Sequence, residues 1–63
     1  MSDLILTPNI DGVDDFYAKL IATHEGLSDA DSNALNARLV LILANHVGDR
    51  AVLSAAMQAA KDA

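Results

Sequence analysis

The segment between Ser28 and Gly48 constrains the fold more than any other part of the sequence, because it carries a helix start signal, an apolar pattern and a helix stop signal. Ser28 and Asp31 have the spacing of a capping box, with aspartate in place of the usual Glu or Gln. Gly48 is a residue type that commonly ends a helix. Between them, apolar residues recur at helical spacing: Leu35, Leu39, Ile42, Leu43 and Val47. The sequence therefore predicts a helix over about 29–47.

Two shorter helices are predicted on either side of this segment. The first follows Asp11-Gly12, covers about 13–25 and has Gly26 as its C′ residue. Its apolar residues fall at i, i+3, i+4, i+7 and i+8, as Val13, Phe16, Tyr17, Leu20 and Ile21. The second begins at Asp49, a good N-cap residue, and covers about 49–61. Its apolar side consists of Val52, Leu53, Ala56, Met57 and Ala60.

The residues before the first helix are predicted to form an extended arm. The apolar run Leu4-Ile5-Leu6 ends at Thr7-Pro8-Asn9, and Pro8 favours an extended conformation for the residue before it. We expect this arm, residues 1–10, to lay Leu4 and Leu6, or Ile5, on the helical core. Very short turns join the helices, so neighbours should run roughly antiparallel. The expected fold is all-α: a small three-helix bundle with an extended N-terminal arm, in a single helical domain spanning residues 1–63.

The chain is too short to bury a large core alone. For 63 residues and 6.6 kDa, surface scaling gives about 9,600 Å² for the unfolded chain and about 3,900 Å² for the folded one. The sequence contains no cysteine, so neither a disulfide nor a thiolate metal site can add stability. A monomer is therefore expected to be marginally stable, and a partner surface would help.

The charge balance limits the classes of partner. The formal net charge is −5, which argues against a nucleic-acid backbone or an anionic membrane surface. The N-terminus has no signal-peptide pattern, and the longest apolar run, Leu39 to Ala44, is too short to cross a bilayer. We therefore expect a soluble cytoplasmic protein that contacts neither nucleic acid nor membrane. Most of the acids lie at predicted helix starts, where they complement the helix dipole: Asp11, Asp14, Asp15, Asp29, Asp31 and Asp49.

His24 and His46 are the residues with the clearest potential for binding chemistry. Each precedes a glycine by two positions at a predicted helix end, where a cationic imidazole complements the dipole. On a helical wheel His46 shares the stripe of Leu35, Leu39 and Ile42, so we expect it to be partly buried, with a hydrogen bond from one ring nitrogen. The alternative is a small-molecule or metal-binding helical module that uses His24 and His46, although a third convincing ligand is missing.

The sequence shows no catalytic constellation. It has no cysteine nucleophile, no serine in a glycine-rich elbow and no glycine-rich loop that could cradle a phosphate. Asp29 and Asp31 lack the downstream glycine and glutamate of a calcium loop. We therefore expect no enzyme activity, no cofactor and no resident metal.

The predicted central helix is apolar over more of its circumference than two short neighbours can cover. Its second apolar face is expected to pair with its counterpart in a two-fold homodimer, with Asn36 setting the register. The alternative is that the arm covers this face within one chain, through Leu4 to Leu6. Arg38 has no acidic partner at helical spacing and, with Asn45 and His46, is a candidate contact for another protein. The candidate interface residues are Asn36, Val40, Leu43, Ala44 and Val47.

Short motifs between Pro8 and Asp49 carry a resemblance to a known family. They are Pro8-Asn9-Ile10, Asp15-Phe16-Tyr17, His24-Glu25-Gly26-Leu27-Ser28, Leu35-Asn36-Ala37-Arg38-Leu39 and Leu43-Ala44-Asn45-His46-Val47-Gly48-Asp49. Together they resemble a family of short bacterial proteins that is catalogued only as a domain of unknown function. Its genes often lie near those for flavin-dependent hydroxylases and other steps of aromatic-compound breakdown, so the resemblance implies an accessory role beside a metabolic enzyme.

The family carries no established catalytic residues that could be transferred to this chain. We therefore expect a small non-catalytic interaction or accessory protein that self-associates through its central helix. A homodimer is the expected assembly, and a metabolic enzyme is a further candidate partner.

Overall fold

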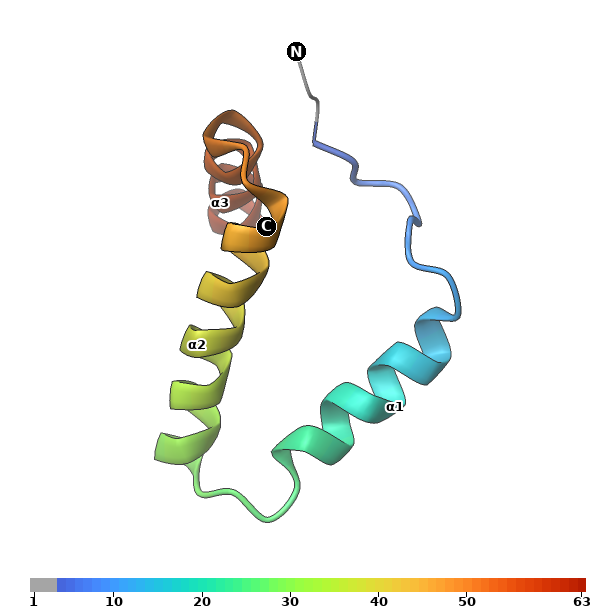
Figure 1. Cartoon of the computed structure of the whole chain (residues 1–63), viewed down its shortest axis with the longest axis vertical. Coiled ribbons are helices and arrows are strands. Elements are labelled where there is room, and N and C mark those ends of the chain that lie inside the picture. The colour runs from blue at the N-terminus through green and yellow to red at the C-terminus, as the bar shows by residue number, and fades with distance from the viewer. Residues whose placement is uncertain (1–3) are drawn as a thin grey trace.

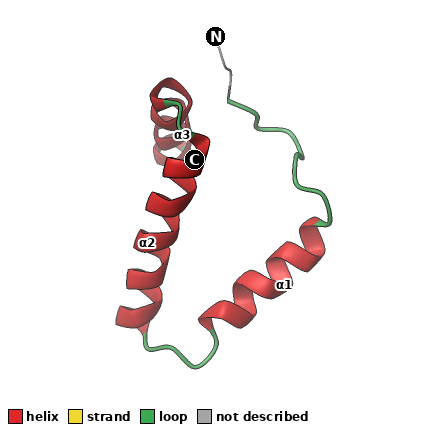
Figure 2. Cartoon of the chain, viewed as in Figure 1, coloured by secondary structure: helices red, strands yellow, loops and turns green. Residues whose placement is uncertain are grey.

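The computed structural model describes residues 4–63, in which three α-helices follow one another along the chain (Figure 1). They are α1 (Val13–His24), α2 (Asp29–Val47) and α3 (Arg50–Asp62). Figure 2 shows that the remainder of the described chain is loop and turn, without a strand. The all-α class with three helices is therefore confirmed, and each helix begins and ends within one residue of its expected position.

The helix boundaries are held by the signals that the sequence carries. The Ser28 hydroxyl accepts a hydrogen bond from the Asp31 backbone N–H at 3.2 Å, which caps α2. The Asp49 carboxylate accepts from the backbone N–H groups of the second and third residues of α3. Gly48, at the end of α2, has a φ of 70°, a left-handed conformation that glycine adopts without a steric penalty. Local chemistry thus fixes both ends of α2.

Replacing Ser28 by alanine is expected to lower the free energy of unfolding by about 0.5–2 kcal/mol, because the first turn of α2 then loses its side-chain acceptor. Ser28→Asp should be nearly neutral, since aspartate is an equally good cap. Thermal or urea melts followed by circular dichroism, at one protein concentration, measure both variants. Equal stability of the wild type and Ser28→Ala would show that this cap does not stabilise α2.

The three helices do not form the expected bundle within one chain. In Figure 1, α1 and α2 diverge from the short loop that joins them, and α3 turns away at the far end of α2. The helices barely contact one another, and no residue of the described chain is buried. The Cα radius of gyration is 13.4 Å. A compact chain of this length would have a radius of about 11 Å.

The solvent-exposed area of the chain also shows that its helices do not pack into a compact bundle. The chain exposes 5,575 Å². A compact folded monomer of its mass would expose about 3,900 Å². The apolar stripe of α1 faces solvent along much of its length, with Phe16 42% exposed. The bundle prediction was wrong because it assumed that apolar faces of one chain must meet each other, whereas α1 diverges from α2 (Figure 1) and the helices barely contact one another.

The expected packing of the N-terminal arm is also corrected. Residues 4–10 contain no helix or strand, but Ile5 and Leu6 are 60% and 77% exposed and therefore do not cover a helical core. The arm leaves α1 at the end farthest from the loop to α2, so it does not run along the face of α2 (Figure 1). Leu4 is half-buried. The first three residues of the predicted arm lie outside the described residues.

Candidate functional site

The described residues bring together no metal-binding cluster, since no group of three or more His, Cys, Asp or Glu side chains converges within residues 4–63. His24 contacts Ser32 at the start of α2, whereas His46 lies in the last turn of that helix. Ser32 and His46 are separated by about 21 Å at a rise of 1.5 Å per residue. Within one chain, the predicted His24 and His46 pair therefore cannot hold a common ion.

His24 has a structural partner instead. Its Nδ1 atom shares a hydrogen bond with the Ser32 hydroxyl, and both side chains are half-buried. The Leu27 backbone N–H also donates to the His24 carbonyl at 3.2 Å. Together with the Ser28 cap, these bonds tie the end of α1 to the first turn of α2. Sequence analysis did not predict this contact, although the spacing of His24 and Ser32 across the turn at Gly26 could have suggested it.

His46 is exposed, which contradicts its predicted partial burial, and no hydrogen bond of its ring is found among the described residues. The wheel placed His46 correctly on the stripe of Leu35 and Leu39. Within the part of the chain that the structure describes, no other helix covers the end of that stripe, so sharing it does not bury the imidazole. Of the two histidines, only His24 is half-buried.

An apolar groove lies between the C-terminal half of α2 and the adjoining face of α3. It encloses about 460 Å³ and is open to solvent. All of its lining side chains are apolar, so it offers no side-chain hydrogen-bond donor or acceptor to orient a polar ligand. The lining residues are Val40, Leu41, Leu43, Ala44 and Val47 from α2, and Leu53, Ala56, Met57 and Ala60 from α3.

This α2–α3 groove contains most of the interface residues expected from the sequence. Val40, Leu43, Ala44 and Val47 line it, and Val40 is 64% exposed. Asn36 is exposed on α2 about one turn before Val40 and does not line the groove. The presence of these residues at an interface stays a prediction.

Arg38 and Asn45, which the sequence suggests as contacts for another protein together with His46, lie outside the groove. Both residues are exposed on α2.

Sequence analysis missed the contribution of α3, because it assigned Leu53 and Met57 to the core of a bundle. Met57 is 67% exposed. The signal was available in the apolar stripe predicted for the last helix, which needs a cover that the described residues, 4–63, do not provide.

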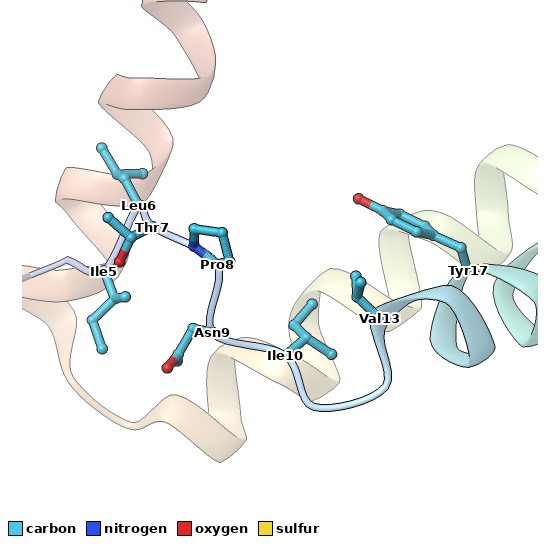
Figure 3. Close-up of a pocket in the computed structure, with 8 residues that line it drawn as sticks. All are labelled: Ile5, Leu6, Thr7, Pro8, Asn9, Ile10, Val13 and Tyr17. Atoms are coloured by element: carbon cyan, nitrogen blue, oxygen red, sulfur yellow. The ribbon is translucent and has the colours of Figure 1, made fainter.

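A second hollow lies where the arm meets α1 (Figure 3). It encloses about 560 Å³, and the ring of Tyr17 reaches from α1 towards the arm. One wall consists of residues 5–10, which form no helix or strand, and the hydroxyls and amide around it do not converge on one point. The hollow is lined by Ile5, Leu6, Thr7, Pro8, Asn9, Ile10, Val13 and Tyr17. The α2–α3 groove, which is built on two helices, is the better-formed candidate site.

None of the helices in residues 4–63 combines the length and the hydropathy needed to cross a membrane.

A family model described as "Protein of unknown function (DUF2783)" matches residues 4–62, which include all three helices. No curated protein matches the chain. No solved structure matches it either.

Proposed function

The chain belongs to the DUF2783 family of proteins of unknown function, and from that premise we propose that it is a small, non-catalytic interaction protein that self-associates as a homodimer. The proposal names a second copy as the partner because the chain leaves a large apolar surface without a cover. It assigns no catalytic residue and no cofactor. The accessory role beside a metabolic enzyme, which the resemblance implies, is not needed for it.

The observation that carries this proposal is the exposed area. The chain exposes 5,575 Å². That is about 1,700 Å² more than a compact monomer of 6.6 kDa would expose. A stable dimer of standard size buries about 800 Å² on each partner. The surplus is therefore large enough for a stable interface on every copy.

The nature of the surplus area also supports association. Val40, Leu41 and Met57 are each more than 60% exposed around one groove. Contiguous apolar surface of this kind mostly marks an interface or a ligand-binding groove. Since the lining offers no polar side chain for a ligand, a second apolar protein surface is the better match.

Self-association predicts that the melting temperature rises with protein concentration. A dimer that unfolds to two separate chains gains stability from mass action, whereas a monomer melts at the same temperature at every concentration. Circular dichroism melts across a hundredfold range of concentration measure the effect. A constant melting temperature over this range would contradict the proposal.

A further inference from the structure

Residues 4–63 present two apolar surfaces that do not pack against each other: the stripe on α1 and the α2–α3 groove. We propose that each groove is filled by α1 of a second copy, so that the homodimer forms by exchange of α1. This inference rests on the proposed self-association and adds the segment that enters the groove. A two-fold dimer of this kind covers both surfaces of both copies through two identical contacts.

The length of α1 prevents it from filling its own groove. If α1 folded back along α2, Val13 would reach about 16 Å from the loop, at 1.5 Å per residue. Val40 lies about 16 Å along α2, but Leu43 and Val47 lie about 21 Å and 27 Å along it. Most of the groove therefore lies beyond the reach of α1 from the same chain.

The loop between α1 and α2 also holds α1 away from its own α2. The hydrogen bond between His24 and Ser32 joins the two helices at that loop, and the Leu27 N–H bonds the His24 carbonyl. In this geometry α1 diverges from α2, as Figure 1 shows. The apolar stripe of α1 is largely exposed, with Phe16 at 42% and Ile21 at 64%. Such a displayed helix is available to another copy.

The dimensions of the two surfaces match. The stripe of α1 from Val13 to Ile21 is about 12 Å long. The groove extends about 10 Å along α2, from Val40 to Val47, and a similar length along α3. A groove between two helices accepts a single helix, which α1 supplies.

Charges at the edges of the two surfaces are complementary. On a wheel of about 100° per residue, Asp14 lies about 20° from Ile21, at one edge of the α1 stripe. On α3, Arg50 and Lys61 lie about 20° and 40° from Met57, at one edge of the groove face. All three charged side chains are exposed, so an acidic edge can meet a basic one when α1 docks.

Cysteine cross-linking tests this exchange cleanly, because the chain contains no cysteine of its own. Val13→Cys places a thiol on the α1 stripe, and Ala44→Cys places one in the groove. Equal amounts of the two variants are mixed, equilibrated and treated with a short bismaleimide. Intact mass spectrometry then separates the mixed product from the two self-linked products. Ala22→Cys, on the opposite side of α1, replaces Val13→Cys in the matched control.

The exchange predicts that Val13→Cys and Ala44→Cys give the mixed cross-link in at least about tenfold excess over the Ala22→Cys control, because docking raises the effective thiol concentration. Predominant self-linking of Ala44→Cys would instead mean that the groove faces its counterpart, which overturns the exchange and leaves self-association intact. A double variant that carries both Val13→Cys and Ala44→Cys is treated in the same way. If it links only within single chains, α1 fills the groove of its own chain, which would overturn both proposals. If light scattering shows dimers but no mixed cross-link forms, the exchange of α1 is overturned and self-association is retained.

Discussion

Val40→Asp is expected to convert the proposed homodimer into monomers and to raise its dissociation constant by at least about a hundredfold. In the isolated chain Val40 is 64% exposed, so an aspartate there would be solvated and would change stability by no more than about 0.5 kcal/mol. In the dimer the same carboxylate would be buried against apolar groups, which costs several kcal/mol. Sedimentation velocity at a series of concentrations measures the shift.

Asn45→Asp is the matched control for this substitution. It introduces the same charge on the same helix, at an exposed position about 140° around α2 from Val40 and outside the groove. The control should dimerise like the wild type. A Val40→Asp protein that remains dimeric would exclude the α2–α3 groove as the interface.

Met57→Asp is expected to weaken the dimer by a comparable factor from the other side of the groove. Met57 lines the groove from α3 and is 67% exposed in the single chain, so the fold of one chain does not depend on its side chain. A large loss of association in Met57→Asp would therefore indicate that a second copy buries Met57. Fluorescence anisotropy of labelled chains under dilution gives the dissociation constant.

Ala55→Asp provides the corresponding control on α3. Ala55 is exposed, lies about 160° around the helix from Met57 and does not line the groove. If Met57→Asp associates as tightly as Ala55→Asp, α3 takes no part in the interface. The contact surface would then be restricted to α2.

The helices could be predicted from sequence because local chemistry determines them. Ser28 and Asp49 cap backbone N–H groups within three residues, and Gly26 and Gly48 adopt the positive φ that follows a helix. Each of these signals acts over one turn and needs no information about distant parts of the chain. The helix boundaries are accordingly placed to within one residue.

The arrangement of the helices could not be predicted in the same way. A helical wheel identifies the apolar sides of α1 and α2 but does not identify what covers them. The sequence prediction therefore paired these sides within one chain and buried His46, although His46 and the arm residue Leu6 are exposed. The bond between His24 and Ser32 was missed because it depends on the direction in which α1 leaves the loop.

The α2–α3 groove could be predicted from the sequence only in part. Val40, Leu43, Ala44 and Val47 were identified because they form a second apolar face on a helix that already has one. Their neighbours on α3 were not identified, since alanine-rich stripes such as Ala56 and Ala60 indicate packing without indicating the partner. The groove thus includes four apolar residues that the sequence singled out on α2 as interface candidates, and it also includes residues of α3 that the sequence did not single out as such.

Static light scattering on the purified protein measures self-association of the open chain directly. A self-associating chain has a mass close to twice 6.6 kDa at high micromolar concentration, falling towards 6.6 kDa on dilution or in Val40→Asp. Circular dichroism on the same samples establishes whether the helices are present. A constant mass of 6.6 kDa at high micromolar concentration, with the helices intact and Val40→Asp still folded, would contradict self-association.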